Sequence, residues 1–174
     1  MSDVSDNDAM QDVREEAEKY RGGAPRPLAG YVLLMAVFSA LVSGTTGLAF
    51  ATGRRLPSEL NALDLLLLTV GTHKLARTIS KDSATSPLRS PFTRFEESGA
   101  PAEVNEQVRR PTQTTHAIGE LITCPFCLGL WTATGFSIGM VFAPRLTRLV
   151  AATFSMSAGA DFLQLAYTRM QPSE

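Results

Sequence analysis

The sequence has little of several residue types on which common protein chemistries depend. Its 174 residues include two cysteines, two histidines and one tryptophan, and the formal net charge is only −1. Two cysteines three positions apart cannot join distant parts of a fold, so a disulfide-stabilised scaffold is excluded. A nearly neutral chain has no strong attraction to nucleic acid, and we expect no such partner. A dinucleotide fingerprint and a P-loop are also absent.

Long apolar runs are what the sequence has instead. Residues 28–51 carry no charge over 24 positions, which is enough for one tilted membrane helix. The run at 60–79 has a short uncharged centre, with Asp64 on one side and basic residues on the other. Runs at 118–143 and 146–168 flank Pro144 and are expected to form an antiparallel pair. The sequence therefore predicts an all-α integral membrane protein with about four transmembrane helices in the lipid bilayer.

The segments outside these runs predict the topology. Residues 1–27 hold seven acidic and four basic residues, and such a stretch is expected to be a disordered acidic tail. Residues 80–117 form the one long loop, between the second and third helices of a membrane domain at 28–174. Twelve of the 16 Lys and Arg residues fall on the side of both termini and this loop. The positive-inside rule therefore predicts a multi-pass protein of the cell membrane with cytoplasmic N and C termini.

Ionisable residues gather toward the cytoplasmic ends of the predicted helices. His73, Lys74 and Arg77 follow the apolar centre of the second helix, and Asp161 lies at a similar depth on the fourth. An ionisable side chain within a bilayer is costly unless it is paired. The sequence therefore predicts a structural ion pair between Asp161 and either Lys74 or Arg77.

The long loop begins with a first motif, KDSATSPLRSPF. Within the loop, 93–98 is expected to form a helical turn and the following segment an exposed linker. One interpretation lays the aromatic and arginine side chains of this region on the membrane surface, with guanidinium groups among lipid phosphates. A plain connecting loop is the alternative. The residues of interest in the motif are Lys81, Asp82, Pro87, Arg89 and Phe92.

The second motif, GELITCPFCLGLW, contains Cys124 and Cys127. A cysteine at a helix N-terminus faces free amide donors that favour its thiolate, and a proline suits the first helical turn. One interpretation is thiol redox chemistry, in which Cys124 attacks, Cys127 resolves, and His73 or Asp161 transfers protons. A second is a zinc site completed by His73, His116 or a second chain, because zinc requires four ligands. A third is two buried cysteines that only pack against a neighbouring helix.

The two motifs together resemble the bacterial membrane proteins grouped as domain of unknown function 1360. The linker between them departs from the pattern, because it is long and rich in Pro, Glu and Arg. The family has no established activity, so the resemblance implies a membrane protein and leaves its reaction open. The resemblance covers roughly residues 60–170 and is carried by Arg77, Lys81, Asp82, Pro87, Arg89, Phe92, Glu120, Leu121, Cys124, Pro125, Cys127, Gly129 and Trp131.

The favoured function is a non-enzymatic membrane or interaction component, which presents residues 80–117 to a cytoplasmic protein or associates with further copies of the chain. A membrane thiol-disulfide oxidoreductase using Cys124 and Cys127 is the first alternative. A CxxC metal-binding membrane protein is the second, and zinc is the one cofactor that enters these hypotheses.

Overall fold

The chain folds as a group of antiparallel helices with a small sheet at one end. The structure is a computed structural model, and it describes residues 2–54, 56–57 and 59–171. In chain order the elements are α1 (Ser2–Arg21), α2 (Leu28–Ala51), α3 (Ala62–Lys81), the 3-10 helix η1 (Ser83–Thr85), α4 (Ser86–Arg89), β1 (Thr93–Ser98), β2 (Val104–Val108), α5 (Gln113–Thr123), α6 (Pro125–Phe142) and α7 (Pro144–Met170).

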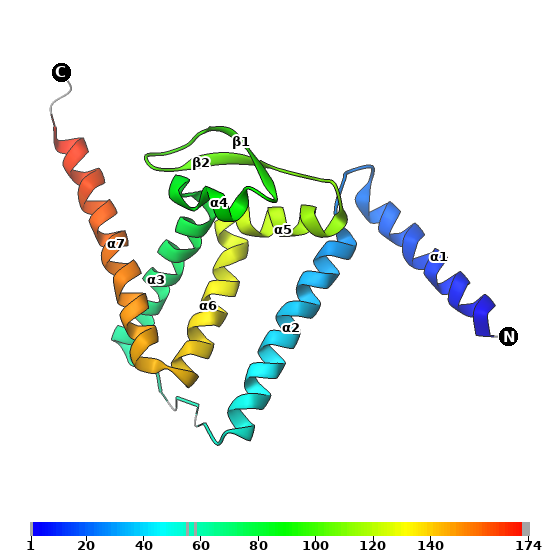
Figure 1. The fold of residues 1–174 in the computed structure, drawn as a ribbon, viewed down its shortest axis with the longest axis horizontal. Coiled ribbons are helices and arrows are strands. Elements are labelled where there is room, and N and C mark those ends of the chain that lie inside the picture. Colours follow the sequence, from blue (N-terminus) through cyan, green and yellow to red (C-terminus); the bar gives the residue numbers. More distant parts are fainter. Residues whose placement is uncertain (1, 55, 58, 172–174) are drawn as a thin grey trace.

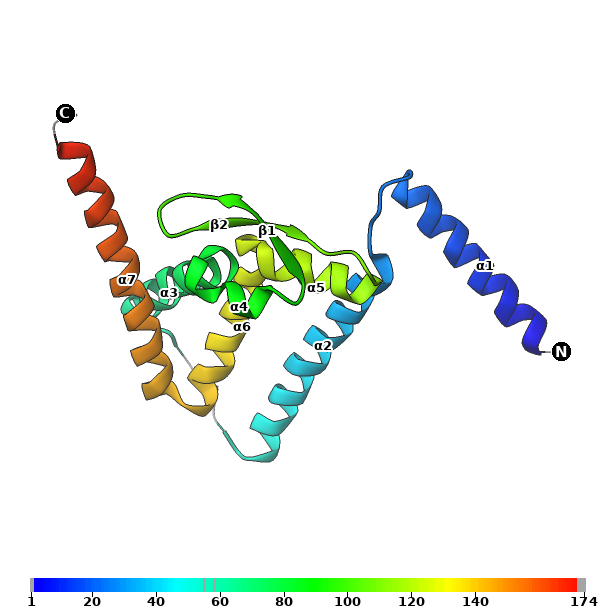
Figure 2. The same ribbon diagram turned by 45° about the horizontal axis from the view of Figure 1, so that its top comes forward.

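The long helices alternate in direction, as Figure 1 shows. Helix α2 runs away from the hairpin formed by β1 and β2, α3 returns to it, α6 runs away again and α7 comes back. The hairpin, η1, α4 and α5 lie together at one end, which we call the capped end; the view in Figure 2 brings them forward. The end of α2, the start of α3 and the turn between α6 and α7 lie at the opposite end.

Small residues allow α3 and α7 to approach closely. A Cβ added to Gly71 of α3 would come within 2.9 Å of the Ala151 carbonyl oxygen of α7. The Ser155 hydroxyl of α7 donates a hydrogen bond of 2.8 Å to the Leu67 carbonyl of α3. Ala151 and Ala158 of α7 are also buried. Contact of helix backbones over small residues is the usual way in which apolar helices pack in lipid.

An ion pair joins α3 to α7 near the opposite end. The Arg148 guanidinium donates from Nε to Asp64 Oδ1 at 2.8 Å and from Nη2 to Asp64 Oδ2 at 2.9 Å. The Asn61 side chain accepts from the Asp64 backbone N–H at 2.7 Å and so caps the start of α3. The charge of Asp64 at this end of α3 is therefore paired inside the chain.

Three helices, α2, α6 and α7, are long and apolar enough to cross a membrane. Few of their residues are buried within the chain, so most of their apolar surface faces outward. Among the described residues α3 does not belong to this group, because its apolar centre is short. The described residues thus contain three candidate spans, and the predicted number of four stays a prediction.

The expectation of an all-α protein is wrong for residues 80–117. Strand β1 pairs antiparallel with β2 from Thr93 opposite Val108 to Ser98 opposite Val104, and the register is interrupted between Phe95 and Glu97. The expected helical turn at 93–98 is therefore a strand. Backbone hydrogen bonds close the turn between the strands, where Ala102 has a φ of 66°. Strands β1 and β2 are short and polar, so the sequence lacks the alternation of apolar and polar residues that predicts a strand.

The predicted third helix at 118–143 is also corrected, because the structure divides it into α5 and α6. The break falls at Cys124, whose φ of −100° and ψ of 107° are extended. Cys124 precedes Pro125, and a residue before proline is driven from the helical region by contact with the proline ring. Helix α5 consequently lies across the capped end instead of continuing α6 (Figure 1).

The N-terminal segment forms helix α1, although its composition predicts a disordered tail. Exposed ion pairs join Lys19 to Glu16 at 3.1 Å and Arg21 to Glu18 at 3.0 Å, one turn apart. Such pairs, together with helix-favouring Glu, Ala and Lys residues, support a helix through local interactions.

We expect Gly30→Ala to loosen the contact between α2 and α5. A Cβ at Gly30 would lie 2.3 Å from the Gln113 carbonyl oxygen and 2.5 Å from Ala117 Cβ, so the helices must move apart. Overpacking of this kind costs about 1–3 kcal/mol, which thermal unfolding in detergent would measure. Gly44→Ala in the same helix is the control, because nothing lies within 4 Å of its added Cβ. Equal melting temperatures for the two variants would contradict this packing.

Candidate functional site

Arg89 organises the first motif at the capped end. Its side chain is fully buried, and its Nε and Nη2 atoms donate to the two oxygens of Glu106 at 2.8 and 3.1 Å. Nη1 donates to the Ile79 carbonyl and the Thr85 hydroxyl, both at 2.6 Å. Nη2 also donates to the Asp82 carbonyl at 2.9 Å. One side chain thus connects the end of α3, the η1–α4 turn and strand β2.

The other residues of the first motif support this arrangement. The Asp82 carboxylate accepts from the Ala84 N–H at 2.8 Å and caps η1. Pro87 lies in the first turn of α4, and the half-buried Phe92 donates its N–H to the Arg89 carbonyl at 2.8 Å. Lys81 ends α3. The interpretation that placed Arg89 among lipid phosphates is therefore wrong, because its guanidinium is buried with protein partners.

Glu106 has a pKa below the ordinary range of a glutamate. Burial of its carboxylate opposes ionisation and would raise the pKa. Hydrogen bonds from Arg89 and Thr93, together with the Arg89 charge, stabilise the ionised form by more than burial destabilises it. The Thr93 hydroxyl lies 2.9 Å from Glu106 Oε2. The Glu106 carboxylate is therefore ionised at neutral pH.

We predict that Arg89→Met strongly destabilises the capped end. The substitution leaves the Glu106 carboxylate, which is 6% exposed, without its charged partner. Breaking a buried ion pair on one side costs about 3–5 kcal/mol. Chemical denaturation in detergent micelles would measure the loss. Arg94→Met on the exposed side of β1 is the matched control and is expected to be nearly neutral. A loss no larger than that of the control would contradict the central role of Arg89.

The stability of the hairpin should depend on pH in the acid range. The pKa of Glu106 is lower in the folded chain than in the unfolded chain, where it is about 4.3. The contribution of Glu106 to the free energy of unfolding is therefore complete above that unfolded-state pKa and is lost as pH falls through the folded-state pKa. Hydrogen exchange of the β1 and β2 amides, followed from pH 6 downward, should therefore accelerate below about pH 4 relative to intrinsic exchange. Glu106→Gln should flatten this dependence, and an unchanged profile would refute the assignment.

The second motif lies at the break between α5 and α6. Cys124 is the N-cap of α6, and its Sγ accepts a hydrogen bond from the Cys127 backbone N–H at 3.2 Å. Cys124 is half-buried and Cys127 is exposed, and both are free thiols. The sequence placed both cysteines well inside a continuous helix, whereas the structure places them in the first turn of α6.

Three polar residues from α2 and α5 accompany the cysteines. The Tyr31 hydroxyl of α2 donates to Glu120 Oε2 of α5. Glu120 Oε1 lies 3.2 Å from His116 Nε2, one turn earlier in α5. That contact is short enough for an ion pair but outside hydrogen-bonding geometry, so the buried Nε2 has no hydrogen-bond partner among the described residues. Glu120 lies in the last turn of α5, directly before the break at Cys124.

A second polar cluster lies between α3, α7 and the hairpin turn. Lys74 Nζ lies 2.5 Å from Asp161 Oδ2, while Arg77 donates to both oxygens of Glu103 at 2.6 and 2.9 Å. These pairs line a cavity of about 700 Å³ together with His73. Neither cysteine lines this cavity. His73 and Asp161, the proton carriers in the sequence-based redox hypothesis, are thus gathered in a different cluster.

Zinc ligation by His73, His116 and the two cysteines receives no geometric support. Within residues 2–54, 56–57 and 59–171, no three His, Cys, Asp or Glu side chains are arranged to hold a metal ion. A site shared between two chains stays an untested prediction.

Sequence reasoning missed several partners in these clusters. Tyr31, Glu103 and Glu106 each complete an interaction with a residue that the motifs identify. A buried arginine requires a carboxylate, which is a usable signal, but the linker offers several glutamates and no means of choosing among them. Tyr31 lies 89 positions from Glu120 and gives no local signal.

Together the fold and these clusters define a small protein of antiparallel apolar helices with a polar cap at one end. The chain belongs to the DUF1360 family of proteins of unknown function, whose family model matches residues 67–167. Sporulation protein YjcA of Bacillus subtilis (strain 168) is 37% identical to it over 81 residues, covering 45% of this chain and 68% of that protein. No solved structure matches the chain. The family match contains both motifs and confirms the resemblance that they suggested.

Proposed function

We propose that this protein is a multi-pass component of the cell membrane whose capped end faces the cytoplasm and contacts a protein partner. The apolar exterior of α2, α6 and α7 is the first support. Large apolar side chains such as Val32, Phe50, Leu130, Leu149 and Met156 are exposed along them. Exposed apolar surface on this scale is stable when lipid covers it.

The observation that carries the proposal is the internal pairing of the charges on α3. Asp64 pairs with Arg148, Lys74 with Asp161, and Arg77 with Glu103. Ionisable residues are tolerated at membrane depth when they face the helix bundle and are paired. Helix α3 can therefore act as a fourth span, although its own apolar centre is short.

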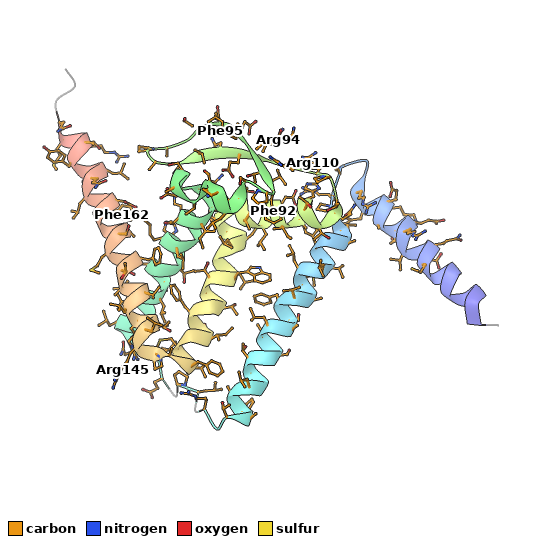
Figure 3. The ribbon with its side chains drawn as sticks, in the orientation of Figure 1. Phe92, Arg94, Phe95, Arg110, Arg145 and Phe162 are labelled. Carbon is orange, nitrogen blue, oxygen red and sulfur yellow. The ribbon has the colours of Figure 1, made fainter. Side chains whose placement is uncertain are left out.

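The distribution of basic residues supports the orientation. Figure 3 shows Arg94 and Arg110 at the capped end and Arg145 at the opposite turn. Twelve of the 16 Lys and Arg residues belong to the capped end and the two terminal segments, and the positive-inside rule assigns that side to the cytoplasm.

The first motif supports a structural role for the capped end. Arg89, its most buried residue, is engaged in internal hydrogen bonds and so supports the surface of the capped end. The outer face of that surface exposes Leu88 and Phe95 next to Arg94. Exposed apolar side chains beside arginine are typical of protein-binding surfaces, and either a cytoplasmic protein or another copy of this chain would suit them.

Labelling of single cysteines would test the orientation. In a Cys124→Ser, Cys127→Ser background, Ser98→Cys at the hairpin should react with a membrane-impermeant maleimide only after the cells are permeabilised. Arg145→Cys, at the opposite turn, should react in intact cells. Both positions are exposed in the structure, so their intrinsic reactivities are comparable. Labelling of both sites from the same side of the membrane would disprove the proposed topology.

A further inference from the structure

We propose that Cys124 and Cys127 form a thiol-disulfide exchange site at the α5–α6 break, with Glu120 as the proton acceptor. This activity goes beyond the membrane-component role proposed above. The substrate class is an accessible disulfide in a peptide segment. The proposal rests on the position of Cys124, on the polar residues of α5 that precede it and on the exposure of Cys127.

Cys124 is placed to be the attacking thiol. It caps α6, and its sulfur accepts the Cys127 backbone N–H at 3.2 Å. The unpaired amides and the positive dipole end of a helix N-terminus stabilise a thiolate at this position. Cys127 lies in the first turn of α6, is exposed, and carries the resolving thiol.

The residues beside the dithiol supply a second, independent observation. The His116 side chain is only 7% exposed, yet its Nε2 has no hydrogen-bond partner among the described residues. It faces Glu120, which Tyr31 holds from α2 and which lies in the last turn of α5, directly before the break at Cys124. A carboxylate held between a tyrosine and a buried histidine, one helical turn before a thiol, is arranged to accept and share a proton.

The reaction proceeds in two balanced steps. The Cys124 thiolate attacks one sulfur of the substrate disulfide, forms a mixed disulfide and releases the other sulfur as a thiolate. Cys127 then loses its proton to Glu120 and attacks the Cys124 sulfur, which closes the internal disulfide and releases the second substrate thiolate. Both released thiolates are protonated, the latter with the proton held by Glu120. The substrate disulfide gains two electrons, and the Cys124–Cys127 dithiol loses two.

The surface around the dithiol favours a peptide substrate. Phe126, between the two cysteines, is 93% exposed and provides an apolar contact that a small hydrophilic disulfide cannot use. A peptide whose disulfide is flanked by apolar residues should therefore react faster than oxidised glutathione. Phe126→Ser should therefore lower the ratio of the peptide rate to the glutathione rate, and an unchanged ratio would contradict this role of Phe126.

The first test traps the mixed disulfide in the full chain, purified in lipid nanodiscs. With oxidised glutathione as the probe, Cys127→Ser should retain a glutathione adduct on Cys124, seen by intact-mass spectrometry. Cys124→Ser, which keeps only the resolving thiol, should form its adduct roughly tenfold more slowly, as expected for a thiol without amide stabilisation. The unaltered chain should instead gain an internal disulfide, seen as a loss of two mass units. Equal, slow rates in the two variants, or no internal disulfide, would overturn the proposal.

The second test addresses Glu120. Glu120→Gln should slow closure of the internal disulfide severalfold and leave formation of the Cys124 adduct unchanged, because only closure transfers the Cys127 proton. Glu120→Asp should recover part of the closure rate. Glu103→Gln, which removes a carboxylate in the separate cavity cluster, is the control. An unchanged closure rate in Glu120→Gln would disprove its role as proton acceptor. A change in Trp131 fluorescence would show that Glu120→Gln has lost its fold. In that case Tyr31→Phe is the second variant, because it keeps the Glu120 carboxylate and removes the hydroxyl that holds it, and it is expected to slow the same closure step.

Discussion

The buried Arg89–Glu106 ion pair is the interaction on which the capped end depends. Two charges withdrawn from water are tolerable only when nearly every hydrogen-bonding site around them is occupied. Here the guanidinium meets a carboxylate, a hydroxyl and the carbonyls of Ile79 and Asp82. Because Glu106 comes from β2, the pair also sets where the hairpin lies. A two-stranded sheet has little stability of its own, and this contact supplies what its short strands lack.

The charged residues of α3 are likewise paired with residues of opposite charge elsewhere in the bundle. Asp64 meets Arg148 near one end, and Lys74 meets Asp161 nearer the other. Two pairs ten residues apart on α3 determine both the register and the rotation of α3 against α7. Gly71 lies between these levels and allows the backbones to touch. The ion pairs and the close backbone contact thus fix the position of α3 against α7 together. Apolar side chains alone would allow the two helices to slide along each other.

The sequence predicts the helices far better than it predicts the cap. A charge-free stretch of 24 residues and the proline at 144 are local signals, and they place α2 at its observed bounds and the start of α7 two residues late, at 146 instead of 144. The hairpin has no such signal, because its strands are short and polar and its stability comes from Arg89, outside both strands. The Tyr31–Glu120 contact depends on how α5 crosses α2, which is a tertiary property. The break at Cys124 was recognisable from Pro125, but a proline in a first helical turn is equally compatible with one longer helix.

That break also explains why the two motifs belong to one structure. If α5 continued straight into α6, Cys124 would lie inside a helix and the amides around it would bond to the preceding turn. With the chain extended at Cys124, α5 turns across the capped end and meets the hairpin. Gly119 of α5 lies so close to it that an added Cβ would come within 2.4 Å of Val108 Cγ1 and 3.1 Å of the Phe92 carbonyl oxygen. The hairpin, which Arg89 positions, therefore packs against α5, the helix that leads into the cysteines. We expect a change in either motif to affect the structure of the other.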